Sequence, residues 1–184
     1  MPRIYVASLT DYNHGVLHGE WIDADQDPDA IQEEVNAMLA ASPTAKRYGQ
    51  TAEEWAIHEY DEFSGIELGE WESFERVSAL AALLRDKPAA LVAYFVEDGQ
   101  DLDDIPDLIS DRFMGEYDES TELRAVAAHH RELLDGRSDI PEDIAAHLDA
   151  VAEAMAHDDI NGGGVHTVEV RGPSSTTFYV LSNC

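Results

Sequence analysis

The sequence predicts an α+β protein built from three small domains in series. Segments rich in strand-forming residues lie toward both ends of the chain, while the middle carries apolar residues at helical spacing. The predicted domains are an N-terminal α+β domain (1–61), a central helical domain (62–111) and a C-terminal α+β domain with a closing hairpin (112–184). Segments of this size bury limited cores, so we expect packing between them or against a second subunit.

The first domain should contain a three-stranded sheet and one helix. Residues 3–8 and 16–22 hold strand formers and flank turn-forming residues 11–15, which predicts a hairpin, and a third strand is predicted from Trp55 onward. Between them, the dipeptide 27–28, Asp-Pro, is typical of a helix start. The helix is expected to end at Ser42 and Pro43 and to be followed by a loop. Its apolar face comprises Ile31, Val35, Met38 and Leu39.

The central domain is predicted to be helical. Gly65 and Gly69 mark its start, and Pro88 and Pro106 can each begin a new helix. The first helix is indicated by the apolar spacing of Trp71, Phe74, Val77, Leu80, Leu83 and Leu84.

The C-terminal domain returns to a mixed pattern. Residues 112–117 predict a short strand, and 123–134 and 140–155 predict two helices. Residues 165–170 and 176–181 predict the closing hairpin. The domain is therefore expected to be a small sheet with helices.

The chain is strongly acidic along its whole length. It carries 39 acidic and 11 basic residues, a net charge of −28, and the thirds 1–61, 62–121 and 122–184 contribute −9, −12 and −7. Such self-repulsion costs the compact state free energy, so the charge needs a compensating function. A pI near 4.2 argues against binding nucleic acid directly or an anionic membrane, and it favours basic partners.

Hydropathy indicates where the protein is located, and cysteine content limits its disulfides and metal sites. No apolar run reaches the length of a membrane span and the N-terminus does not resemble a signal peptide, so we expect a cytoplasmic protein. The single cysteine, Cys184, excludes an internal disulfide framework and a cysteine-based zinc site, and its terminal thiol is expected to have no role.

Metal and catalytic motifs give little support to an enzyme. Residues 23–34 approximate a calcium-binding loop, but Pro28 occupies the sixth place, which needs glycine. The pairs His14/His18 and His129/His130 do not share a helix face, which favours structural roles. No phosphate-binding loop or nucleophile elbow is present. We therefore predict no catalytic residue, no metal and no cofactor.

The densest acidic stretch lies between residues 97 and 119. Acids four apart on a helix rise about 6 Å, and acids two apart on a strand about 6.7 Å, which is the coarse spacing of charges on a nucleic-acid backbone. A solvated acidic face is the simpler interpretation of the stretch alone. Its acids are Glu97, Asp98, Asp101, Asp103, Asp104, Asp107, Asp111, Glu116, Asp118 and Glu119; Asp23 and Asp25 are two further candidates.

Three segments resemble a known family. Residues 4–9 read IYVASL, residues 12–21 read YNHGVLHGEW and residues 55–60 read WAIHEY. This run is similar to the ArdA antirestriction proteins. A second element resembles the family's antirestriction motif, although Arg85 and Lys87 place bases where neutral residues are expected. Its matching residues are Leu83, Leu84, Asp86, Pro88, Tyr94, Phe95 and Glu97.

The resemblance implies both a shape and a function. It implies an elongated, curved homodimer that mimics bent double-stranded DNA and occupies the DNA-binding groove of type I restriction-modification enzymes. The partner would be the methyltransferase core with its DNA-binding subunit, in a bacterial cell that receives a mobile genetic element. Two chains would carry a net charge of about −56, equivalent to about 95 Å or about 28 base pairs of duplex.

The acidic composition is also compatible with two alternative functions. Only Lys46 and Lys87 are lysines, against nine arginines, which fits a protein adapted to high salt. A generic acidic module that binds another basic DNA-binding protein is the second alternative. An enzyme is the weakest interpretation and would require convergent polar groups in a concave apolar pocket.

Overall fold

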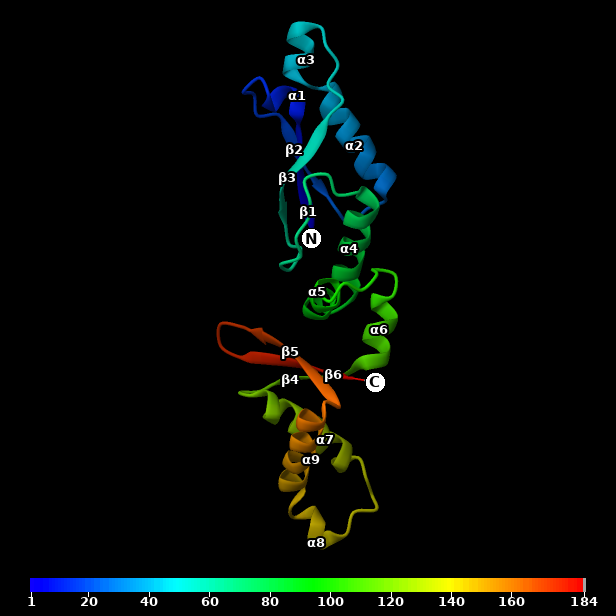
Figure 1. Ribbon diagram of the computed structural model, residues 1–184, viewed down its shortest axis with the longest axis vertical. Coiled ribbons are helices and arrows are strands. Elements are labelled where there is room, and N and C mark those ends of the chain that lie inside the picture. The colour runs from blue at the N-terminus through cyan, green and yellow to red at the C-terminus, as the bar shows by residue number, and fades with distance from the viewer. Residues whose placement is uncertain (184) are drawn as a thin grey trace. The chain divides into compact units, whose positions relative to one another are not determined.

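The computed structural model, which describes residues 1–183, confirms the α+β class. Two compact units, Met1–Leu102 and Asp103–Cys184, each contain a three-stranded antiparallel sheet and helices (Figure 1). The finer division into three domains stays a prediction. The expectation for Cys184 falls outside the described residues. No helix within residues 1–183 combines the length and the apolar character needed to cross a membrane.

The sheet of the first unit has β1 (Arg3–Ser8) at its centre, between β2 (Gly19–Asp23) and β3 (Trp55–Asp61). Both neighbours run antiparallel to β1. The central strand is the most buried of the three, as expected for a strand paired on both edges. The pairing with β3 shifts between Tyr5 and Val6, where an irregularity is inserted.

The predicted hairpin is correct in its pairing but wrong in its second boundary. That strand begins at Gly19 rather than Val16, because the short helix α1 (Leu9–Tyr12) follows β1 directly. Ser8 caps α1 by accepting a hydrogen bond from the backbone N–H of Asp11. Val16 is consequently exposed in the connecting loop, so the local capping chemistry outweighs its strand propensity.

Helix α2 (Pro28–Ala40) confirms the predicted start. The Asp27 side chain accepts from the backbone N–H of Asp29 at 2.9 Å, and Pro28 occupies the first turn. The helix packs against β1 and β2, and its four predicted apolar residues are buried.

The loop predicted after Ser42 instead contains α3 (Pro43–Tyr48). Ser42 caps this helix, accepting from the Ala45 N–H at 3.0 Å, and Gly49 ends it in the left-handed conformation. A helix of six residues is too short to show apolar periodicity, which explains why the pattern missed it.

Two helices complete the first unit, and both were predicted. The prediction was wrong for Trp71, which was expected on the apolar face of the first helix but lies before its start and is exposed. Helix α4 (Phe74–Asp86) is capped by Ser73, and α5 (Ala89–Glu97) starts after Pro88. Lys87 is extended, the conformation that a following proline imposes. Helix α4 packs against both α2 and α5.

The second unit is built around β6 (Thr176–Ser182), which pairs with β4 (Phe113–Asp118) and β5 (Val165–Arg171). The closing hairpin β5–β6 is confirmed. Helix α6 (Ile105–Arg112) precedes β4, and α7 (Glu122–Asp135) packs against the sheet. The core cluster comprises Ala125, Val126, Ala156, Val165, Phe178 and Val180.

The single helix predicted over 140–155 is wrong. The structure has a short helix α8 (Glu142–Ala145) and a longer α9 (Leu148–Gly162), separated at Ala146 and His147. No residue of α8 is buried, so no core contact holds the two pieces in one straight helix. Helix α9 packs against α7 and runs on past residue 155.

Candidate partner-binding surface

The acidic side chains lie almost entirely on the surface. All 39 fall within residues 1–183, and of these only Asp11 is buried. The repulsion predicted from the sequence is therefore between carboxylates in contact with water, where the high dielectric constant weakens it. The fold can carry the charge because the other 38 carboxylates stay outside its cores.

The dense acidic stretch of residues 97–119 is distributed over both units. Glu97 ends α5 of the first unit and is followed by two exposed acids, Asp98 and Asp101. The second unit contains the remaining acids, before and along α6 and on and after β4. All seven are exposed except Glu119, which is half-buried: Asp103, Asp104, Asp107, Asp111, Glu116, Asp118 and Glu119.

Within the second unit, the stretch follows the spacing proposed for a phosphate backbone. On α6, Ile105 and Ile109 face inward while Asp107 and Asp111, four residues apart, are exposed, a rise of about 6 Å. On β4, Glu116 and Asp118 are both exposed and two residues apart, which corresponds to about 6.7 Å. Helix and strand thus each present a pair of carboxylates to solvent.

These ten acids make no ion pair within residues 1–183. Two of them accept hydrogen bonds from neutral groups: Asp98 from the Gln100 amide and Asp118 from the Thr177 hydroxyl. Carboxylates without a cationic partner keep their full charge available for a basic partner.

The other two candidates, Asp23 and Asp25, differ from each other. Asp23 is exposed and accepts a hydrogen bond from the backbone N–H of Asp25 at 3.0 Å. Asp25 is half-buried and forms an ion pair with Arg85, which also pairs with Asp86. The hydrogen bonds that Arg85 donates to Asp86 and then to Asp25 raise its pKa above the ordinary value. Asp25 therefore already has a cationic partner, which it shares with Asp86, and Asp23 is the carboxylate without one.

The antirestriction-motif residues lie at the α4–α5 connection. Leu83 and Leu84 are half-buried near the end of α4, Asp86 is exposed, and Pro88 makes the turn into α5. The unexpected base Arg85 pairs with both Asp25 and Asp86, so its single positive charge is shared between two carboxylates. Further along α5, Tyr94 is half-buried and Phe95 is buried, with their ring centroids 5.0 Å apart, and Glu97 is exposed.

The buried carboxylate of Asp11 has an internal structural role that the sequence did not predict. The backbone N–H of Thr44, at the start of α3, donates to its Oδ1 at 2.9 Å. Burial by itself raises the pKa of Asp11. This effect is outweighed by the hydroxyls of Ser42, Thr44 and Ser8 and by the Thr44 N–H, which stabilise the charged form, so the pKa falls well below its ordinary value. Asp11 therefore stays ionised and joins the α1 turn to α3.

The adjacent histidines of α7 are buried and point to different elements. The hydroxyl of Tyr117 on β4 lies 3.1 Å from Nδ1 of His129 and donates to Glu132 at 2.9 Å. Nε2 of His130 lies 2.8 Å from Oδ2 of Asp159 on α9. Burial, with a smaller effect of His130, lowers the pKa of His129. This arrangement ties α7 to the sheet and to α9.

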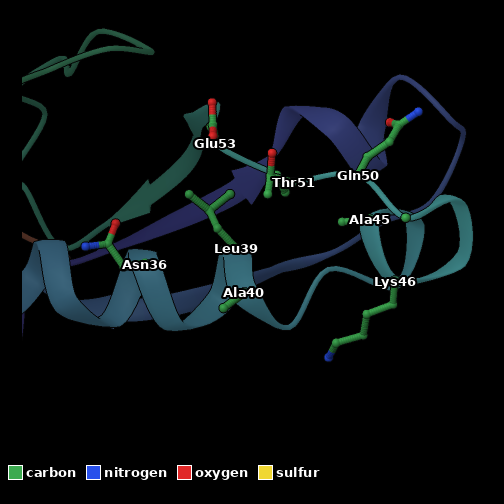
Figure 2. Close-up of a pocket in the computed structure, with 10 residues that line it drawn as sticks. Asn36, Leu39, Ala40, Ala45, Lys46, Gln50, Thr51 and Glu53 are labelled. Carbon is green, nitrogen blue, oxygen red and sulfur yellow. The ribbon is translucent and has the colours of Figure 1, made fainter.

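A cavity of about 650 Å³ lies between the end of α2, α3 and the segment leading to β3. Figure 2 shows that the ammonium group of Lys46 points away from Gln50, Thr51 and Glu53. The Lys46 ammonium instead donates to the Ala41 carbonyl oxygen at 3.0 Å. Polar groups that diverge in this way do not form the convergent set that catalysis requires.

Comparison with known proteins identifies one matching protein family. No match was found among curated proteins. The family model described as "Antirestriction protein (ArdA)" matches residues 4–170, which cover most of the 184-residue chain and include the three N-terminal segments, the α4–α5 connection and the whole acidic stretch. The chain therefore belongs to the ArdA family of antirestriction proteins.

Proposed function

We propose that this protein inhibits type I restriction-modification enzymes by mimicking bent double-stranded DNA and occupying their DNA-binding groove. The observation that carries the proposal is the surface position of all but one of 39 acidic side chains in a chain of the antirestriction family. Such a surface resembles a phosphate backbone in charge, and it is present on both compact units.

The mechanism requires positioning and charge but no chemical step. A DNA-binding groove carries lysines and arginines that neutralise phosphates, and carboxylates at comparable spacing compete for them. Each inhibitor occupies one groove and is not consumed, so inhibition is stoichiometric. The unpaired acids of α6 and β4 are the strongest candidates for these contacts, because they need not give up an internal ion pair first.

The proposal extends to the partner and the assembly. The groove belongs to the methyltransferase core and its DNA-binding subunit, and the inhibitor acts as a homodimer. The site of action is the cytoplasm of a bacterial cell that receives foreign DNA, where it protects a mobile genetic element. A dimer would carry the charge of roughly 95 Å of duplex, twice that of one chain.

The direct test is competition between this protein and duplex DNA for a purified type I methyltransferase core, with the oligomeric state measured in parallel. We expect displacement of the DNA at about one dimer per core. The affinity should fall steeply between low and physiological salt, because the contacts are ionic. Failure to compete, or an affinity independent of salt, would contradict mimicry.

Adaptation to high salt is the second candidate, favoured by the two lysines among 11 basic residues. A protein adapted to high salt unfolds in dilute buffer, whereas a mimic remains folded there and binds its target. We expect a cooperative melting transition well above room temperature at low ionic strength. If added salt is required for folding, the adaptation hypothesis becomes the better one.

A further inference from the structure

The sheet of the first unit presents an outer face that combines aromatic, cationic and acidic side chains. Directly paired residues of antiparallel strands project to the same side of a sheet. The pairing of Ile4 with Ile22 places two buried side chains on the inner face. The outer sheet face is formed by two rows, Asp23–Arg3–Asp61 and Trp21–Tyr5–Glu59.

At the centre of this face, Arg3 is held between a ring and a carboxylate. Its guanidinium carbon lies 4.6 Å from the ring centroid of Trp21, and one of its amino groups donates to Oδ2 of Asp61 at 3.0 Å. The Tyr5 ring packs beside Trp21, with centroids 5.5 Å apart. Trp21 is 40% exposed, and the side chains of Arg3 and Asp61 are about half exposed. The arrangement is therefore accessible from solvent.

We propose that Trp21 and Asp61 form a guanidinium-binding site, which Arg3 occupies in the free protein and an arginine of the restriction enzyme occupies in the complex. The inference rests on the proposed function for the identity of the partner. It adds a specific contact to a surface whose other interactions are purely ionic.

Charge and shape both favour arginine as the occupant. The face carries three carboxylates against the single cation Arg3, so it retains a negative charge that attracts a basic group. A planar guanidinium can stack on an indole and donate to a carboxylate at the same time, as Arg3 does here. An ammonium group is compact and more strongly hydrated, so lysine gains less.

Arg3 acts as an internal competitor in this scheme, which permits a matched test. Arg3→Gln and Arg76→Gln each remove one cation that is paired with an acid in the first unit, Asp61 and Glu72 respectively. Both changes alter the net charge equally, but only Arg3→Gln removes the guanidinium group that lies over the Trp21 ring. We expect Arg3→Gln to bind the methyltransferase core about threefold to thirtyfold more tightly than Arg76→Gln. Equal affinities would overturn the proposal.

Removing the ring should have the opposite effect. Trp21→Ala is expected to weaken binding by about threefold to thirtyfold while leaving the salt dependence unchanged, because no charge is lost. Trp71→Ala is the control, since Trp71 is 70% exposed and lies outside the sheet. In the Trp21→Ala background, Arg3→Gln should give no gain beyond that of Arg76→Gln. A full gain there would show that the ring is not involved.

A measurement without the enzyme separates this site from the proposed function. We would titrate the Arg3→Gln protein with an arginine-rich peptide and with a lysine peptide of the same length, following the indole N–H resonance of Trp21 by NMR. A shift at lower concentrations of the arginine peptide supports the site, and identical responses to both peptides overturn it. Failure of the wild type to displace DNA from the enzyme would instead contradict the proposed function alone.

Discussion

The two compact units have similar net charges but bury different polar groups. Met1–Leu102 has 21 acidic and 6 basic residues, and Asp103–Cys184 has 18 and 5. The first unit buries an ionised carboxylate, Asp11, whereas the second buries the adjacent imidazoles of His129 and His130. The two units are thus similarly acidic on the surface but differ in the polar side chains that they bury.

The difference separates what partner binding demands from what folding demands. A mimic needs charge over its surface, and both units supply it with exposed acids. Folding needs elements joined across the core, and each unit does this with its own buried polar groups, which are Asp11 for α1 and α3 and the histidines for α7, β4 and α9. The surface and the interior can therefore be changed independently by mutation.

The largest expected effect tests whether the apolar cores of the two units contribute similarly to the free energy of unfolding. Phe74 of the first unit and Phe178 of the second are both almost fully buried. Changing either to alanine should cost about 3–5 kcal/mol of unfolding free energy. Hydrogen exchange of the amides in each unit measures the loss. A cost below about 1 kcal/mol at one site would show that its unit has the weaker core.

The next effect concerns the carboxylate of the first unit. Asp11→Asn should destabilise the protein by about 1–3 kcal/mol at neutral pH, because it removes the buried charge that the Thr44 N–H and the surrounding hydroxyls stabilise. The pKa of Asp11 is lowered by folding, so this stability is present above about pH 4 and is lost as the pH falls further. Denaturant unfolding between neutral and acidic pH should show the stabilities of the two proteins converging below about pH 4. Asp29→Asn, at an exposed acid in the first turn of α2, is the control and should change little.

A smaller effect is expected from the contacts of the Tyr117 hydroxyl with His129 and Glu132 in the second unit. Tyr117→Phe removes the hydroxyl that bonds Glu132 and should cost about 0.5–1.5 kcal/mol. Burial, and then Glu132, raises the pKa of Tyr117 to about 12, so the folded state retains this proton. The wild type should therefore lose stability as the pH rises above about 10, and the variant should lose less. Parallel alkaline unfolding curves would contradict this assignment. Tyr12→Phe, at an exposed ring, serves as the control.

The smallest effect belongs to a surface ion pair. Arg137 and Asp139 lie in the second unit, 2.7 Å apart and both well exposed. We expect Arg137→Gln to leave the melting temperature unchanged, because solvent screens such pairs. A clear decrease in melting temperature would show that the few internal ion pairs help to hold this acidic surface together.

Elements with strong local signals were predicted correctly. Asp27 and Pro28 predicted the start of α2 because capping and a fixed φ act within one turn, and the closing hairpin was predicted from its strand formers and turn residues. The boundary of β2 and the break between α8 and α9 were wrong. Both depend on what packs against the segment, and a pattern of residue types does not contain that information.

The sequence by itself determined the α+β class, the order of most elements and the acidic character of both units, because composition and short-range periodicity are properties of neighbouring residues. Only the tertiary structure decided which charges are available. It buried Asp11, paired Asp25 with Arg85, left the acids of α6 and β4 without an ion pair to any residue of 1–183 and brought Arg3 between Trp21 and Asp61. These relations join residues up to 60 positions apart, and their energies depend on distance and burial in space rather than on spacing along the chain.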